Sequence, residues 1–174
     1  MNRTFGLKEE FEYFFEDVSR VVICYDYEEV DDEHCTWRQI VFYKKQGFPD
    51  VKKVKDAILA DINRQTEDKI LRGFVWNDIN VWLSEENQKN FSEAQRVAVM
   101  TEGASLPIKF KLGENEDEEP IYYTFNTVGE LNSFYLSAVA FIQQCLNEGW
   151  ERKDNIDFSV YEAIEPSHEV VEEE

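Results

Sequence analysis

The stretch that most constrains the fold is LRGFVWNDINVWLS, at residues 71–84, where two short runs of aromatic and β-branched side chains flank one polar break. Runs of this kind with a period of two are typical of β-strands. A two-residue turn at Asn77–Asp78 would pair Trp76 with Ile79 across two antiparallel strands. The stretch therefore predicts a β-hairpin.

The hairpin places its two tryptophans on opposite faces. One face is apolar throughout and carries Phe74, Trp76, Ile79, Val81 and Leu83. This consistency predicts that Trp76 lies in the core. Trp82, on the face with Val75 and Asn80, either covers a second layer or lies exposed as an anchor in an interface, where tryptophan is enriched. Packing of Trp82 is favoured because large aromatic side chains are usually mostly buried. A third possibility, that Trp82 forms a platform for a carbohydrate, has no independent support.

Two further pairs of alternating runs predict hairpins at residues 20–45 and 106–125. In the first strand of the earlier hairpin, alternation places four apolar residues on one face, namely Val21, Ile23, Tyr25 and Tyr27. In the second strand it places three on one side, namely Trp37, Val41 and Tyr43.

Apolar residues at helical spacing predict three amphipathic helices, after Asp50, after Ser84 and after Thr127. Thr127 and Glu130 form a capping box. Thr66 is predicted to cap a further helical turn, which Gly73 would end in the left-handed conformation. Gly103 and Gly149 are predicted to end the two later helices.

Hairpins and helices thus alternate, with no pattern of parallel strands. The predicted fold class is α+β, a single compact domain in which three antiparallel hairpins alternate with amphipathic helices, with an N-terminal hairpin extension. Residues 1–48, including a hydrophobic helix FEYFFEDV, are a possible subdomain because Gly47–Pro49 is the clearest break. Residues 49–162 form the main domain, and residues 163–174 an acidic tail without fixed structure.

Composition limits the partners. Among 174 residues, 37 are acidic and 18 are basic, so the formal net charge of −19 repels nucleic acids and anionic membranes. The three cysteines, at positions 24, 35 and 145, show no disulfide framework and predict reduced thiols in a cytosolic setting. The N-terminus lacks the apolar core of a signal peptide, and the longest apolar run, residues 134–142, is too short to span a membrane.

No motif predicts an enzyme, a metal or a cofactor. His34 and His168 are the only histidines, and adjacent His34–Cys35 lacks the spacing of a zinc half-site. Calcium at the acidic loop 114–119 is conceivable, but the loop lacks EF-hand spacing. A nucleophile elbow, a P-loop and a dinucleotide fingerprint are all absent from the sequence, so no catalytic residue is assigned.

Several markers carry a family resemblance: the Thr66–Gly73 turn, the hairpin of Trp76 and Trp82, the helix start at residues 86–91, and Gly149-Trp150 followed by Lys153. Over about residues 50–162 the chain resembles an uncharacterised domain family of tailed phages and prophages of gut bacteria, found in tail or tail-fibre-associated proteins. The family has no motif that assigns chemistry.

The resemblance implies a non-enzymatic phage tail-associated protein that acts by protein–protein binding. It would be a virion structural component, or an assembly chaperone in the bacterial host cytoplasm. The expected partner is a tail or tail-fibre protein, or a second copy of the chain. The residues expected to contact it are aromatic: Phe11, Tyr13, Phe14, Phe15, Trp37 and Trp82.

Two other functions stay open. The charge of −19 suits an acidic DNA mimic that blocks a host-defence enzyme, although much of the acidity sits in loops and in the tail. An enzyme that acts on host surface polysaccharide is a more distant alternative.

Overall fold

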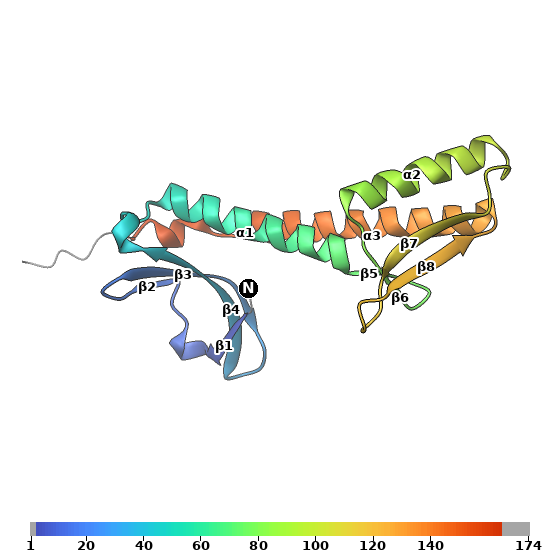
Figure 1. Cartoon of the computed structure of the whole chain (residues 1–174). Coiled ribbons are helices and arrows are strands. Elements are labelled where there is room, and N and C mark those ends of the chain that lie inside the picture. The colour runs from blue at the N-terminus through green and yellow to red at the C-terminus, as the bar shows by residue number, and fades with distance from the viewer. Residues whose placement is uncertain (1–2, 165–174) are drawn as a thin grey trace, which may run out of the picture. The chain divides into compact units, whose positions relative to one another are not determined.

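A computed structural model describes residues 3–164 (Figure 1). Its contacts divide the chain into two units, the first formed by residues 1–62 and 151–174 and the second by residues 63–150. Two helices, α1 (Val51–Arg72) and α3 (Val128–Asp154), contribute residues to both units. Of the predicted acidic tail, residues 163–174, the part from residue 165 onward, with His168, lies outside the described residues. Ile164, which was assigned to the tail, is buried in the core of the first unit.

The first unit contains a four-stranded antiparallel sheet in the order β1-β4-β3-β2 (Figure 1). Its strands are β1 (Thr4–Leu7), β2 (Phe14–Glu16), β3 (Arg20–Glu29) and β4 (His34–Tyr43). Three short 3-10 helices belong to this unit: η1 (Lys8–Glu10), η2 (Lys44–Gln46) and η3 (Phe158–Tyr161).

The predicted hairpin at residues 20–45 is confirmed, because β3 pairs with β4. The predicted N-terminal helix FEYFFEDV is wrong. Its central residues form β2, where Phe14 pairs with Ile23 and Phe15 with Val22. The strand turns Phe14 toward the core of the unit, and aromatic side chains suit a pleated surface better than a helix interior.

Both faces of this sheet are covered, so β3 is buried at every position from Val21 to Tyr25. On one face of the sheet, residues of β3 pack with residues of α1 and of the C-terminal segment. This core cluster contains Val21, Ile23, Tyr25, Val54, Ile58, Ile62, Tyr161 and Ile164. A smaller cluster covers the other face: Val22, Cys24, Cys35 and Trp37.

The predicted position of Tyr27 beside Val21 is wrong. The register between β3 and β4 shifts between Tyr25 and Glu28, and Asp26 has a positive φ of 59°. An extra residue at such a bulge reverses the alternation that follows it. Tyr27 therefore contacts Phe11, whose ring packs against the smaller cluster.

In the second unit, β5 (Phe74–Trp76) and β6 (Ile79–Val81) form the predicted hairpin in the predicted register. Asn77 and Asp78 have φ values of 46° and 62°, which give the two-residue turn with the twist that hairpins favour. Helix α2 (Glu85–Met100) follows, and β7 (Ile108–Glu114) pairs with β8 (Pro120–Phe125) as the third predicted hairpin. Trp76 packs against the core of this unit, as predicted.

Three predicted helix boundaries are confirmed. The side chains of Asp50 and Ser84 accept hydrogen bonds from the backbone N–H groups of Lys53 (2.7 Å) and Asn87 (3.2 Å). Gly103, with a φ of 90°, follows α2 in the left-handed conformation.

Gly73 follows the end of α1 as predicted, but its predicted left-handed conformation is wrong, and the prediction that Gly149 ends a helix is wrong. Gly73 ends α1 without a positive φ, and Thr66 lies inside that continuous helix. Gly149 lies inside α3, where an added Cβ would come within 2.6 Å of Thr66 Oγ1. Its role is to let the two helices approach each other closely.

The α+β class with antiparallel sheets is thus confirmed. Whether residues 1–48 fold independently stays a prediction. Within residues 3–164, no helix combines the length and the apolar character that crossing a membrane requires.

Candidate functional site

The six residues expected to contact a partner do not form one surface. Trp82 lies in the second unit and is 39% exposed. The other five lie in the first unit, where Tyr13 and Phe15 are exposed, Phe11 and Phe14 are partly buried and Trp37 is only 7% exposed. Trp37 therefore offers almost no surface to a partner.

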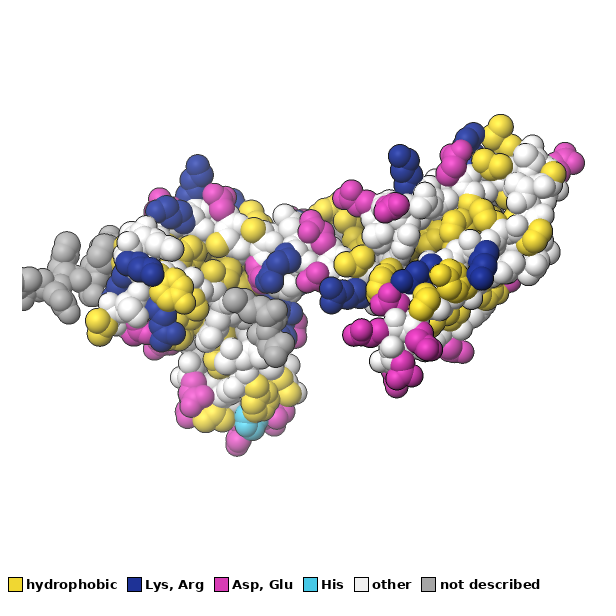
Figure 2. Space-filling model, in the orientation of Figure 1, with side chains coloured by type: hydrophobic (Ala, Val, Ile, Leu, Met, Phe, Trp, Pro, Cys, Tyr) yellow, Lys and Arg dark blue, Asp and Glu magenta, His cyan; other side chains and the backbone are white. Residues whose placement is uncertain are grey.

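Trp82 belongs to an aromatic and basic surface on the second unit, which we name the Trp82 face. Its members are Trp82, Lys109, Lys111 and Tyr122. Lys111 Nζ lies 5.4 Å from the centre of a Trp82 ring, and Lys109 Nζ lies 4.3 Å from the centre of the Tyr122 ring. These are cation–π distances, and the lysine stems also cover part of the rings. Figure 2 shows basic and hydrophobic side chains beside each other on this unit.

Strand alternation produces the face. Lys109 and Lys111 point outward from β7, while Leu112 of β7 and Phe125 of β8 are fully buried. The two hairpins are joined by a hydrogen bond from the Trp82 backbone N–H to the Leu112 carbonyl (2.8 Å). Trp82 is therefore held next to β7.

Gly113 permits this junction. An added Cβ at Gly113 would lie 2.2 Å from the backbone oxygen of Asn80 and 3.9 Å from the Trp82 side chain. Because a backbone oxygen cannot rotate away as a side chain can, only glycine fits at this position.

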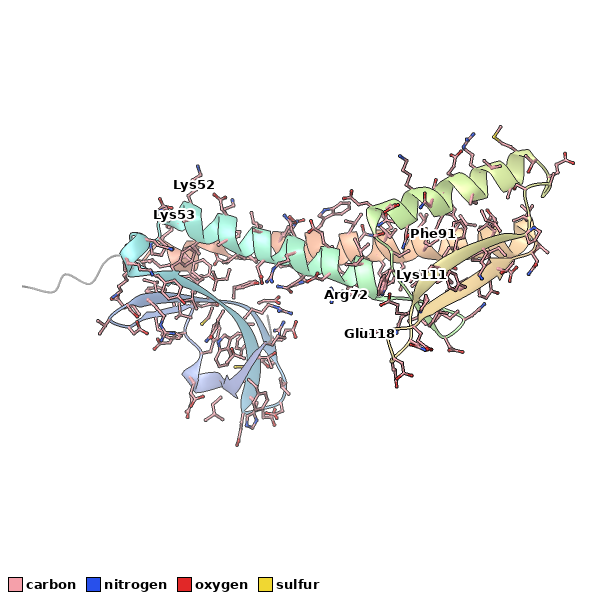
Figure 3. All side chains as sticks on the ribbon, in the orientation of Figure 1. Lys52, Lys53, Arg72, Phe91, Lys111 and Glu118 are labelled. Carbon is pink, nitrogen blue, oxygen red and sulfur yellow. The ribbon has the colours of Figure 1, made fainter. Side chains whose placement is uncertain are left out.

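The charges of the Trp82 face are only partly paired. Lys111 forms an ion pair with Glu114 (2.7 Å), whereas no carboxylate of the described residues lies within 4.0 Å of Lys109 Nζ. A hollow of about 340 Å³ beside Trp82 is lined by Leu71, Arg72 and Trp82. Figure 3 shows Arg72 and Lys111 in this region, on α1 and β7. The face therefore offers apolar surface together with positive charge.

A second candidate lies wholly within the first unit, and we name it the tyrosine pocket. Its volume is about 380 Å³. Residues from the β3 bulge and from the C-terminal segment line it, together with Tyr13: Tyr25, Asp26, Tyr27, Glu28, Arg152, Asn155, Ile156, Asp157 and Tyr161.

Phe11 supports the two exposed rings of this pocket. Its ring centre lies 5.0 Å from that of Tyr13, 4.8 Å from that of Tyr27 and 5.7 Å from that of Trp37. Tyr13 is 48% exposed and Tyr27 is 37% exposed. Phe11, an expected contact, packs against two tyrosines that offer their rings to solvent, and one of them, Tyr13, is also an expected contact.

Asp26 is the centre of an ion-pair cluster at the pocket. Its Oδ2 atom lies 2.9 Å from Arg3 Nη1, 3.2 Å from Arg38 Nε and 2.9 Å from Arg152 Nη2. Arg3 also pairs with Glu28 at 3.1 Å. The cluster joins the N-terminus, β3, β4 and the end of α3.

The floor of the pocket is buried and hydrogen-bonded. The Tyr161 hydroxyl donates to the Cys24 carbonyl (2.8 Å), and burial raises the pKa of Tyr161. Tyr25 donates to the carboxylate of Asp61, which is also buried. Burial raises the pKa of the Cys24 thiol to about 11, so Cys24 is protonated and unreactive at neutral pH.

The positions considered for metals hold other contacts. In the acidic loop, Asn115 Oδ1 accepts the backbone N–H groups of Asp117 (3.0 Å) and Glu119 (2.8 Å). His34 stacks on Phe5 and its Nδ1 lies 2.9 Å from Asp31. Among the residues that the structure describes, no group of three histidine, cysteine, aspartate or glutamate side chains is arranged to hold a metal ion.

Residues 53–168 match a family described as a domain of unknown function (DUF4376). The match spans more than half of the chain, which therefore belongs to this family. No curated protein and no solved structure matches the chain. The family region contains the whole Trp82 face, but Tyr13 and the β3 residues of the tyrosine pocket precede it.

Proposed function

We propose that the protein is a non-enzymatic, phage tail-associated protein that binds another polypeptide through the Trp82 face. It is either a component of the virion tail or an assembly factor for a tail fibre. The resemblance of residues 50–162 to tail-associated domains motivates the biological setting. The observation that carries the binding role is the exposed Trp82 side chain, stacked on a lysine within the family region.

The chemistry of the face suits a protein partner. Tryptophan is enriched among the few residues that dominate the energy of protein interfaces. Lys111 and the junction at Gly113 hold the ring in place before binding, which lowers the entropy lost on association. The expected partner segment places an apolar side chain in the hollow beside Trp82 and a carboxylate near Lys109.

Mass spectrometry of purified virions separates the two versions of the role. A virion component is retained in the particle in fixed proportion to the tail proteins. A released assembly factor is absent from the particle but co-purifies with a tail or tail-fibre protein from phage-producing cells. Absence from both preparations would reject the tail-associated role.

Binding itself is tested with Trp82→Ala. If Trp82 anchors the partner, this change weakens the affinity for the co-purified tail protein by at least about tenfold, an effect typical of a hot-spot residue. Tyr43→Ala is the matched control, because Tyr43 is an exposed aromatic residue of the first unit. Equal affinity for the two variants would exclude the Trp82 face as the binding surface.

A DNA mimic that blocks a host-defence enzyme is the second candidate, favoured by the net charge of −19. In that case the chain captures DNA-binding enzymes and no tail protein. Because long-range charge would then dominate, capture would fall steeply with salt and would not depend on Trp82.

A further inference from the structure

We propose that the tyrosine pocket binds a neutral carbohydrate unit. This site goes beyond the protein-binding role, because the first unit alone forms it and none of its residues belongs to the Trp82 face.

The aromatic part of the pocket fits a sugar ring. A pocket of about 380 Å³ is within the range of small-ligand sites. Tyr13 and Tyr27 line it with partly exposed rings, and the C–H groups on one side of a pyranose pack favourably against such rings. Phe11 contacts both tyrosines, so the rings are oriented before a ligand arrives.

The polar part supplies both kinds of hydrogen-bonding group. The carboxylates of Asp26, Glu28 and Asp157 accept hydrogen bonds, the guanidinium of Arg152 donates them, and the amide of Asn155 does both. A sugar hydroxyl also donates and accepts. Planar polar groups beside aromatic rings therefore complement a ligand with several hydroxyl groups.

The charges at the pocket favour a neutral ligand. The Asp26 carboxylate lies against the guanidinium groups of Arg3, Arg38 and Arg152, and Arg3 also neutralises Glu28. The three guanidinium charges balance those of the three carboxylates that line the pocket, Asp157 being the third. An anionic ligand at Arg152 would have to displace its ion pair with Asp26, and a cationic ligand at Asp26 or Glu28 would have to displace a guanidinium group, whereas a hydroxyl group can bond to the outer atoms of these pairs.

The experiment is an NMR titration of the full chain with the methyl glycosides of glucose, galactose, mannose and N-acetylglucosamine. We expect at least one glycoside to give saturable shifts at Tyr13 and Tyr27, with a dissociation constant on the order of 1 mM, typical of a weak single-site ligand. Inorganic phosphate and the methyl ester of Nα-acetyl-lysine, titrated in parallel, are expected to leave these signals unchanged.

Variants tie the binding to the pocket. Tyr13→Ala and Tyr27→Ala are each expected to weaken the binding of that glycoside at least about fivefold, because each removes an aromatic face. Tyr13→Phe keeps the face and retains binding. Tyr43→Ala is the control, since Tyr43 is an exposed tyrosine of the same unit that does not line the pocket.

Three results would overturn the proposal. The first is the absence of saturable shifts with all four glycosides. The second is glycoside binding that Tyr13→Ala and Tyr27→Ala leave intact, which would place the sugar elsewhere. The third is saturable binding at these tyrosines by phosphate or by the lysine ester in preference to every glycoside, which would assign the pocket to a charged ligand.

Discussion

The two units are built in different ways. The second is one continuous stretch, residues 63–150, in which hairpins and helices pair with their neighbours along the chain. The first closes only when the chain returns, because residues 151–164 bring Arg152 to Asp26 and Tyr161 to the β3 backbone. Local patterns therefore describe the second unit well, whereas distant contacts hold the first unit together.

The second unit should depend most on its central aromatic residue. Phe134 is fully buried, and its ring contacts those of Phe74, Trp76, Phe91 and Phe125. We expect Phe134→Ala to lower the free energy of unfolding by about 3–5 kcal/mol, the usual cost of a large cavity. Urea denaturation measures this loss.

Hydrogen exchange on the same Phe134→Ala variant sharpens the comparison. Amide protection should fall first in β5 to β8 and last in the β3–β4 pair, because the side chain contacts only the core of the second unit. Equal loss in β5 to β8 and in the β3–β4 pair would show that the units unfold as one.

Gly113→Ala should produce the next largest change. The new Cβ would meet the Asn80 backbone oxygen, so we expect a loss of about 2–3 kcal/mol in the free energy of unfolding, together with altered Trp82 fluorescence. Gly129→Ala is the matched control. No atom lies within 4 Å of an added Cβ there, and alanine is the better helix former, so a gain of up to about 1 kcal/mol is expected.

The ion-pair cluster tests how strongly the return segment closes the first unit. Asp26→Asn keeps the shape of the side chain but leaves three guanidinium groups without their shared carboxylate. We expect a loss of about 1–3 kcal/mol in thermal or urea unfolding. Arg96→Gln, which removes an exposed ion pair with Glu93 and an exposed hydrogen bond to Met100 Sδ, should cost no more than about 0.5 kcal/mol. Similar losses for both variants would mean that the cluster does not secure the return segment.

The smallest expected effect concerns pH. The Tyr123 hydroxyl donates to the Glu130 carboxylate at 2.6 Å, which lowers the pKa of Glu130 below 4.5 and raises the pKa of Tyr123 above 10.0. The stabilisation is therefore present between about pH 4.5 and 10. It is lost as the pH falls through the lowered pKa of Glu130, and as the pH rises through the raised pKa of Tyr123.

Unfolding curves of the wild type and of Tyr123→Phe test this window. They should differ most near neutral pH and converge at both extremes. A difference that does not depend on pH would assign the effect to packing alone.

Sequence patterns predicted the features that depend on neighbouring residues. The Trp76–Ile79 register and the caps at Asp50 and Ser84 need only a few residues of local chain. The prediction that Gly149 ends a helix was wrong because Gly149 lies close to Thr66, a contact that the local sequence does not reveal.

The two candidate sites also differ in how far the sequence predicted them. The hairpin pattern placed Trp82 opposite the apolar face and favoured packing, whereas the side chain is 39% exposed. Trp82 was predicted as a contact only with the family resemblance. The tyrosine pocket was not predicted, since the bulge at Asp26 has no sequence signal and Arg152 lies 126 residues further along the chain. Alternation placed Val21, Ile23 and Tyr25 correctly on one face of β3 and failed only at Tyr27, which follows the bulge.

Photo-cross-linking from position 82 tests most directly whether the chain binds a tail polypeptide through the Trp82 face. A photoreactive aromatic residue in place of Trp82, in cells that produce the phage, should form an adduct with a tail or tail-fibre protein. The same residue in place of Tyr43 should not form that adduct. Adducts with DNA-binding enzymes alone, or equal yields of the tail adduct from both positions, would contradict the proposed function.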